Sequence, residues 1–371
     1  MPTIVTVIQA LVHSTLQNSE SGFTAMSRVL EDSKFIASNS KDVQVNAEGC
    51  YRVASWIEHQ LDNLGPKFAN WQDHELHPKS QDAHTLDWIF LIDILNFSFW
   101  SDADTRDSGN HPARFGVRYK GNLYTGYWSL CAAVNKALDN DIPITNPTFY
   151  ADEARCPDDL IASIFASDTK EPVPLLAERI RIMRASGKAL LKHYQGRFVH
   201  LLDKCDHSAQ KLLGLLLKNF PDFRDISLYK GRECYILKRA QILVAETWAC
   251  FHGKSYGRFD DIDSITMFAD YRVPQILWQL GCLDYSAEFE DRLRKSLLIA
   301  HNDPMEIEMR GCSIWAVELV RQAANRQNLN AIMIDFFLWD LAKEWQATGY
   351  SPHQGRVLSS VPSIRVRSIY Y

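Results

Sequence analysis

Apolar residues recur at helical spacing along most of the chain, and this periodicity constrains the fold more than any other feature. In residues 52–64 they form a stripe along one helical face, which ends at Gly65-Pro66. The same spacing predicts further helices at 175–194, 208–219, 240–251, 273–281, 288–301, 313–326 and 329–346. We therefore expect a mainly α-helical protein, folded as a single compact domain.

Strand patterns are few and short, and two of them surround a tight turn. Aromatic and β-branched residues of 115–128 flank the sequence Lys120-Gly121-Asn122, and residues 228–237 repeat the pattern around Lys230-Gly231. The last residues, 363–371, alternate in the manner of an edge strand. We expect small β-hairpin elements added to a helical frame.

The charge balance restricts the partners of the chain. There are 40 Lys and Arg residues against 45 Asp and Glu residues, which gives a formal net charge of −5. A protein that binds a nucleic-acid polymer usually has a basic surface, so we expect no stable nucleic-acid partner. The strongest apolar run, residues 86–100, is too short to span a membrane and contains Asp87 and Asp93, so we expect no membrane association.

Motifs for the common cofactors and catalytic devices are missing. The chain has no GxGxxG, GxxxxGK[ST], HExxH or GxSxG motif, which argues against dinucleotide enzymes, P-loop NTPases, common zinc proteases and α/β-hydrolases. Its 8 cysteines lie singly, which is typical of reduced, buried thiols rather than of a zinc site. No basic N-terminal region supports a signal or transit peptide. We expect a cytoplasmic protein with no cofactor and no metal.

Carboxylates inside apolar segments are the main candidates for functional residues. Asp335 and Asp340 interrupt the apolar run IMIDFFLWDL at 332–341, where a buried ionised carboxylate needs a partner or a function. On a helix they point about 140° apart, so both border one pocket only if the helix forms its wall. The structural alternative stays open: Asp340 faces water, and Asp335 caps a helix or pairs with an Arg.

A third carboxylate lies among aromatic residues. Asp270 follows Phe268 and precedes Tyr271 and Arg272, a combination that suits a planar heterocycle with N–H donors. The residues alone favour the simpler interpretation, in which Asp270 is the N-cap of the next helix and has an Arg beside it.

Two short clusters allow either a functional or an ordinary structural role. The adjacent cations Lys238 and Arg239 suit a phosphate, although a basic pair at a helix start is usually solvated. His74 and His77 lie three residues apart without further metal ligands nearby. For these histidines we favour a ligand contact or a local hydrogen bond over a metal site.

The segment 306–318 combines acids with Arg310 and Gly311. This composition predicts a buried salt-bridge cluster, and the glycine predicts a tight turn before the following helix.

Taken together, these segments resemble the queuosine salvage protein family, and the likeness runs from about Val29 to Tyr371. The motifs that carry it are long: HELHP at 74–78, DWIFLIDILNFSFW at 87–100, RYKGNLYTGYWSLCAAVNKALD at 118–139, SAQKL at 208–212, LKRAQILVAETW at 237–248, SITMFADYRVPQ at 264–275, EIEMRGCSIWAVEL at 306–319 and the terminal IYY. The first 28 residues look like an added extension, so residues 29–371 are expected to form the catalytic unit.

The resemblance implies a helical fold distantly akin to helix-hairpin-helix DNA glycosylases. It also implies an activity, the hydrolysis of the N-glycosidic bond of queuosine 5′-monophosphate, which releases free queuine for reinsertion into tRNA. Ligand-contact positions of the family fall on His74, Phe268, Asp270, Asp335, Phe336 and Asp340. Many relatives have Tyr where this chain has Phe336, so a hydrogen bond from that hydroxyl is in doubt.

Each of these residues receives a role in our hypothesis. Asp335 stabilises the oxocarbenium-like state or activates water at C1′, and Asp270 contacts or assists the base edge. The remaining roles are a ring sandwich by Phe268 and Phe336, contacts to polar parts of the ligand by His74 and Asp340, and phosphate binding by Lys238 and Arg239 with Tyr271 and Arg272 behind them. Which aspartate reaches C1′ is left open by spacing alone.

Two other functions fit the same residues. One is a glycosylase that acts on a flipped base in DNA or RNA, which requires a basic groove around the pocket. The other is a queuine-binding protein without catalytic activity. A release assay with queuosine 5′-monophosphate discriminates between them.

Overall fold

The computed structural model describes residues 27–64, 71–102, 114–324, 326, 329–348 and 361–371. The proposed N-terminal extension therefore lies almost entirely outside the described residues. Within the described part, helices dominate, and three small two-stranded sheets accompany them. The prediction of a mainly α-helical protein with small hairpins is confirmed.

The helices occur along the whole of the described part of the chain. Their bounds are α2 (Arg28–Asn39), α3 (Ala47–Leu64), α4 (Ala83–Ile94), α5 (Tyr127–Asp139), α6 (Pro147–Tyr150), α7 (Asp158–Ile164), α8 (Leu176–Tyr194), α9 (Val199–Leu202), α10 (Ala209–Asn219), α11 (Lys238–Cys250), α12 (Val273–Gln279), α13 (Ala287–Arg294), α14 (Pro304–Ala324) and α15 (Ala331–Thr348). Each helix predicted from periodicity is present. Three bounds differ clearly: α3 begins at Ala47, before the predicted residue 52, α13 ends at Arg294, and α14 begins at Pro304, well before the predicted start.

Both predicted hairpins are present and share one turn geometry. Strand β2 (Gly116–Tyr119) pairs with β3 (Asn122–Thr125), and β4 (Ile226–Tyr229) pairs with β5 (Arg232–Tyr235), each antiparallel. The two turn residues have positive φ in both cases, 47° and 87° at Lys120-Gly121 and 48° and 80° at Lys230-Gly231. This is the turn whose twist matches paired strands.

The third sheet joins distant parts of the chain. Strand β1 (Val43–Val45) pairs antiparallel with β6 (Leu283–Tyr285), a contact that three-residue strands do not reveal in the sequence. The expected edge strand at 363–371 is absent. Only an isolated bridge between Leu298 and Arg365 forms there, because the segment runs through the interior instead of along a sheet.

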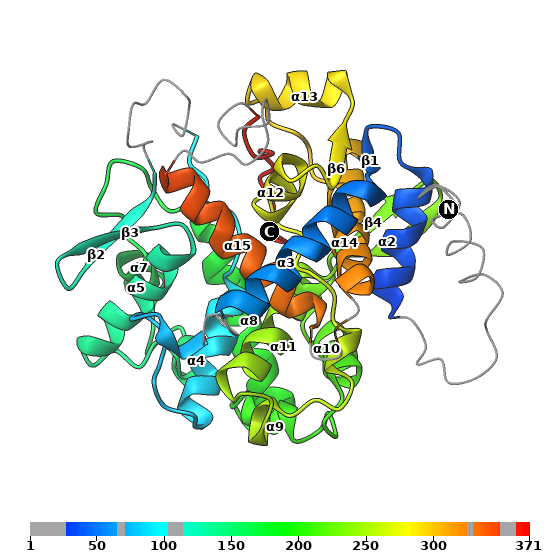
Figure 1. Cartoon of the computed structure of the whole chain (residues 1–371). Coiled ribbons are helices and arrows are strands. Elements are labelled where there is room, and N and C mark those ends of the chain that lie inside the picture. Colours follow the sequence, from blue (N-terminus) through cyan, green and yellow to red (C-terminus); the bar gives the residue numbers. More distant parts are fainter. Residues whose placement is uncertain (1–26, 65–70, 103–113, 325, 327–328, 349–360) are drawn as a thin grey trace, which may run out of the picture.

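Helix α14 is the central element, packed against α2 and α3, with α3 crossing in front of it in Figure 1. The predicted salt-bridge cluster is confirmed on α14: Arg310 donates to both carboxylate oxygens of Asp225 (2.9 and 2.6 Å) and lies 3.6 Å from Glu306. The turn predicted at Gly311 is wrong, because this glycine lies inside the helix. A Cβ atom there would lie 2.6 Å from Cγ2 of Ile36, so Gly311 permits the close approach of α2.

The end of the chain lies in the middle of the molecule, surrounded by α3, α12 and α15 (Figure 1). The backbone carbonyl of Tyr371 accepts a hydrogen bond from the N–H of Ser98 at 3.1 Å, and the Tyr371 ring packs 4.1 Å from the Arg310 guanidinium. The C-terminal residues are therefore part of the core and carry a side chain toward its centre.

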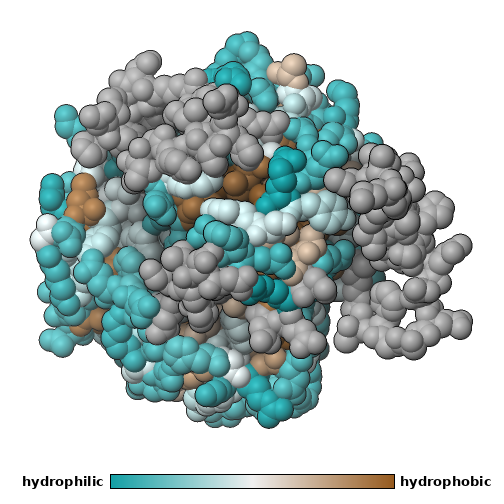
Figure 2. Space-filling view, viewed as in Figure 1, coloured by the Kyte–Doolittle hydropathy of each residue, from teal (hydrophilic) through white to brown (hydrophobic). Residues whose placement is uncertain are grey.

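The surface and the cysteines agree with the composition. Hydrophilic residues dominate the face seen in Figure 2, and its main apolar area lies over α15 and α12. All 8 cysteines are buried, as predicted, and none of them is in a disulfide. Among the described helices, none has the length and hydropathy needed to cross a bilayer.

Candidate active site

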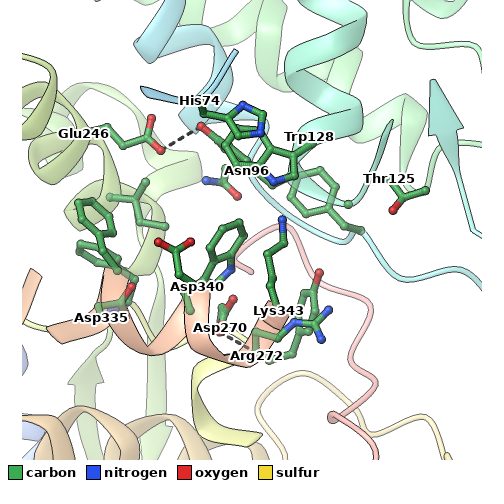
Figure 3. A pocket seen from close by; sticks show the side chains of 18 of the residues that line it. His74, Asn96, Thr125, Trp128, Glu246, Asp270, Arg272, Asp335, Asp340 and Lys343 are labelled. Atoms are coloured by element: carbon green, nitrogen blue, oxygen red, sulfur yellow. Dashed lines mark hydrogen bonds between the residues drawn. The ribbon is translucent and has the colours of Figure 1, made fainter. Parts of the chain in front are cut away.

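One cavity of about 740 Å³ collects side chains from widely separated segments. Its walls come from the loop before α4, the β2–β3 hairpin, the start of α5, α11, the loop before α12, one side of α15 and Tyr371 (Figure 3). Nine of the ten residues that the sequence singled out line it, and the exception is Arg239. The predicted residues thus lie around a common space.

Helix α15 forms one wall of this cavity. Asp335, Phe336, Trp339, Asp340 and Lys343 all line it, and these positions cover one side of the helix. The sequence predicts that Asp335 and Asp340 border one pocket only if their helix forms its wall. The structure meets this condition, because α15 is that wall. Asp335 is buried, whereas Asp340 is exposed.

Asp335 is a buried carboxyl group with one backbone partner. Its side chain is 4% exposed, and its Oδ1 accepts a hydrogen bond of 3.0 Å from the N–H of Phe268. Burial raises the pKa of Asp335 well above its usual range; the Phe268 N–H and the Lys238 charge oppose this shift, and the Asp270 charge adds to it. Asp335 therefore holds a proton more readily than an ordinary aspartate.

Asp270 has a structural role in addition to its place in the cavity. Its Oδ1 accepts hydrogen bonds from the backbone N–H groups of Arg272 (2.7 Å) and Val273 (2.9 Å), at the start of α12. The prediction that Asp270 is the N-cap is wrong, because the N-cap of α12 is Arg272, but the Asp270 carboxylate does hold two backbone N–H groups at the start of this helix. Asp270 also lines the cavity, and these two hydrogen bonds fix the orientation of its carboxylate.

The aromatic residues of the site lie on two sides. Phe268 and Phe336 have their ring centroids 6.0 Å apart and their planes inclined by 52°. His74 stacks on Trp128 with a centroid distance of 3.3 Å and an angle of 6°. The Phe268 and Phe336 rings are tilted and close together, so a flat base held between them would require one ring to move.

His74 is neutral and held locally. Its Nδ1 accepts a hydrogen bond of 3.2 Å from the N–H of Leu76. Burial, and to a smaller extent the positive charge of Lys343, lower the pKa of His74 to about 4. The unprotonated ring presents its edge to the cavity without a positive charge.

The two cations expected at a phosphate have different positions. Lys238 lines the cavity, but its Nζ donates to the backbone O (3.0 Å) and Oδ1 (3.2 Å) of Asn96, and burial lowers its pKa to about 8. Arg239 points away: it donates to the carbonyl oxygens of Ile94 and Asp222 and lies over Phe97. The expectation that Arg239 contacts the ligand is wrong. Its guanidinium group donates hydrogen bonds to backbone carbonyl oxygens of the protein instead.

Sequence reasoning missed a polar chain that ends at Glu246. His77 Nδ1 lies 2.6 Å from the Trp71 carbonyl oxygen, which only accepts, so this nitrogen carries the proton of the neutral ring. Burial lowers the pKa of His77 to about 3, so Nε2 is an acceptor. The Tyr127 hydroxyl lies 3.0 Å both from this Nε2 and from Oε1 of Glu246.

This geometry determines the protonation state of Glu246. A hydroxyl has one proton and cannot donate to two acceptors at once, so the chain is fully satisfied only when the Glu246 carboxyl is protonated. Burial raises the pKa of Glu246 to about 7, in agreement with this arrangement. Glu246 lines the cavity and is 6% exposed. Only the fold reveals it, because Glu246 and its partners come from three separate segments.

No cluster of three or more His, Cys, Asp or Glu side chains with metal-binding arrangement occurs within the described ranges. The cavity is lined by carboxyl groups, aromatic faces and lysines.

Residues 76–371 match the sequence model described as "Queuosine salvage protein". This chain belongs to the queuosine salvage protein family. A relative from Schizosaccharomyces pombe is 70% identical over 93% of this chain and 100% of its own length, and one from Mus musculus is 43% identical over 92% and 98%. A bacterial relative from Sphaerobacter thermophilus is 35% identical over 86% of this chain and 93% of its own. Each is named "Queuosine 5'-phosphate N-glycosylase/hydrolase".

The range that matches the queuosine salvage family contains most of the residues that line the cavity. It begins just after His74 and includes Lys238, Asp270, Asp335 and Tyr371. The resemblance inferred from the motifs is confirmed.

Proposed function

We propose that this chain hydrolyses the N-glycosidic bond of queuosine 5′-monophosphate and releases free queuine for salvage. The observation that carries the proposal is the gathering of carboxyl groups and aromatic rings around one cavity in a chain of this family. The names of its relatives support the substrate and the reaction. We expect the enzyme to need no cofactor and to take the free nucleotide rather than a nucleic-acid polymer.

The chemistry requires negative charge near the sugar. Cleavage of the bond builds positive charge at C1′ and the ring oxygen, which a carboxylate stabilises while it activates water. The base has carbon in place of N7, so protonation at that position is not available and electrostatic stabilisation is more important. We propose that Asp335 acts at C1′, because burial suppresses its ionisation, which is favoured when positive charge develops beside it.

The other carboxylates suit the donors of the ligand. The guanine-like edge offers N–H groups and the cyclopentenyl arm carries a cationic amine, and both form strong hydrogen bonds with carboxylates. We propose that Asp270 contacts or assists the base edge, and that Asp340 and His74 contact polar parts of the ligand. Phe268 and Phe336 provide aromatic surface for the base.

A single incubation tests the proposed function. The protein is mixed with queuosine 5′-monophosphate and free queuine is measured by chromatography. Asp335→Asn keeps an acceptor for the Phe268 N–H, so we expect an intact fold and a kcat lower by about 10²-fold or more. Near-normal queuine release by this variant would overturn the role of Asp335.

The same incubation separates the alternatives. Binding of the nucleotide by the wild-type protein without release of queuine would indicate a carrier. Cleavage of queuosine within intact tRNA, at a rate above that of the free nucleotide, would indicate a nucleic-acid glycosylase.

We also propose three features of the wider molecule. The helical frame is distantly akin to helix-hairpin-helix DNA glycosylases, residues 29–371 form the catalytic unit with 1–28 as an addition, and the protein acts in the cytoplasm. The shared chemistry of base–sugar cleavage supports the first. Helix α2, which starts at Arg28 and packs on α14, supports the second, and the unpaired cysteines support the third. A variant that lacks residues 1–28 should retain queuine release.

A further inference from the structure

Lys343 is a cation of the cavity that lacks an anionic partner. It is part-buried on α15, and among the described residues no carboxylate lies within ion-pair distance of it. Its Nζ lies 4.1 Å from the ring centroid of Trp339 and 5.0 Å from that of Trp128. Figure 3 shows the side chain reaching from α15 into the cavity, beside Asp340 and Arg272.

The surroundings of Lys343 compensate its positive charge only in part. Removing an ammonium group from water is costly unless an opposite charge replaces the lost hydration, and two aromatic faces replace it only in part. Burial and the positive charge of Arg272 lower the pKa of Lys343 to about 8, against the attraction of Asp340. A bound anion would remove both costs.

The two lysines that line the cavity act electrostatically on different side chains. The charge of Lys238 acts on Asp335, whereas the charge of Lys343 acts on His74 and Asp340. Lys343 follows Asp335 by eight residues, which places it about 12 Å further along the helix axis. The cavity thus has an inner end with Asp335 and Lys238, and a second end with Lys343 and Arg272.

We propose that Lys343, with Arg272 beside it, binds the 5′-phosphate of the nucleotide at the end of the cavity away from Asp335. This assignment rests on the proposed function. It places the ribose between the phosphate and Asp335, and it separates the phosphate from the Asp335 carboxyl group, which would repel it. Lysine suits this task because an ammonium group binds phosphate as a point charge from any direction.

This assignment differs from the one based on the sequence. Arg239 has its donors on backbone carbonyls, and Lys238 has Asn96 as its partner and lies near the carboxylates. Neither lysine pairs with an aspartate at ion-pair distance within the described part of the chain, but only Lys343 lacks a hydrogen-bond partner there as well.

The test compares two substrates in each variant. We measure kcat/KM for queuosine 5′-monophosphate and for unphosphorylated queuosine, and take the ratio of the two. Lys343→Met keeps the aliphatic contact with Trp339 and removes the charge, so we expect the ratio to fall about 10- to 100-fold, mainly through KM for the phosphorylated substrate. Lys343→Arg should restore most of the ratio.

Two further variants make the result specific. Lys188→Met removes an exposed charge from α8, far from the lining of the cavity, and should leave the ratio at its wild-type value. A fall of the ratio in Lys238→Met but not in Lys343→Met would place the phosphate at the inner end and overturn the proposal. An equal loss on both substrates in Lys343→Met would also overturn it.

A binding measurement tests the site independently of turnover. Calorimetric titration with ribose 5-phosphate should show binding to the wild-type protein that is at least about 10-fold weaker in Lys343→Met. If the wild-type protein released no queuine from either substrate, the proposed function would be contradicted. The titration with ribose 5-phosphate would then still test whether Lys343 binds phosphate. Equal affinity of the two proteins for ribose 5-phosphate would overturn the phosphate site.

Discussion

Burial determines which side chains of the cavity carry charge. His74 and His77 are neutral because burial lowers the pKa of each to about 4 and about 3. Glu246 and Asp335 are shifted in the opposite direction, toward the protonated form. Buried carboxyl groups that tend to be protonated can ionise when a cationic ligand binds or an oxocarbenium-like state forms beside them.

The protonated state of Glu246 predicts a pH dependence of stability. Its pKa rises from the ordinary 4.5 to about 7 in the folded protein, so the folded state binds one more proton than the unfolded state between these values. The free energy of unfolding must therefore fall as pH rises through this window. Glu246→Gln cannot ionise, and we expect it to gain about 2–3 kcal/mol relative to wild type between pH 5 and pH 8.

Urea unfolding of both proteins at several pH values measures this difference. The contribution of the histidines is common to both proteins and cancels. Glu288→Gln, which removes an exposed carboxylate of α13, is the matched control. Unfolding free energies of Glu246→Gln and wild type that stay parallel from pH 5 to pH 8 would contradict a neutral Glu246.

At the scale of elements, the sequence predicts which segments are helical but not what each helix contacts. Apolar periodicity located α8, α10 and α15 closely, because one buried face needs one apolar stripe. It failed for the start of α14, whose residues 306–312 are buried on all sides and show no clear stripe. Gly311 was interpreted as a turn for the same reason, since its contact is a neighbouring helix and not a loop.

The contact of Gly311 with α2 predicts an unusual effect of alanine. Gly311→Ala would place a Cβ 2.6 to 2.7 Å from three side-chain atoms of Ile36, which is fully buried. Despite the better helix propensity of alanine, we expect a loss of about 1–3 kcal/mol in the free energy of unfolding. Gly214→Ala in α10 is the matched control, because nothing lies within 4 Å of its Cβ position. It should gain up to about 1 kcal/mol.

Denaturation midpoints of the two variants decide the matter. A gain in both would mean that α2 moves aside without cost, and would remove the reason for a glycine at position 311.

At the scale of the whole molecule, the cavity exists only because distant segments converge. Asp270 and Asp335 were predictable, since a carboxylate in an apolar segment is conspicuous by itself. Glu246, Tyr127 and Lys343 were not, because each becomes significant only beside partners from other parts of the chain. Pattern reasoning therefore finds the acids of such a site more readily than the groups that set their charge.

The C-terminal residue shows how far this convergence extends. Tyr371 is 2% exposed, lines the cavity, packs on Arg310 and accepts a hydrogen bond from Ser98. Tyr371→Ala removes a buried ring next to a buried ion pair, so we expect a loss of about 3–5 kcal/mol in the free energy of unfolding, together with weaker binding of queuine. Tyr371→Phe keeps the ring and should lose no more than about 1 kcal/mol.

Thermal unfolding and queuine titration of both variants test this role. If Tyr371→Ala matched Tyr371→Phe in both stability and queuine affinity, the Tyr371 ring would only fill space at the surface. This result would contradict its place in the core. A loss of stability with unchanged queuine affinity would mean that Tyr371 supports Arg310 and Asp225 but does not shape the cavity. The expected joint loss instead follows from one ring that packs against the ion pair on one side and lines the cavity on the other.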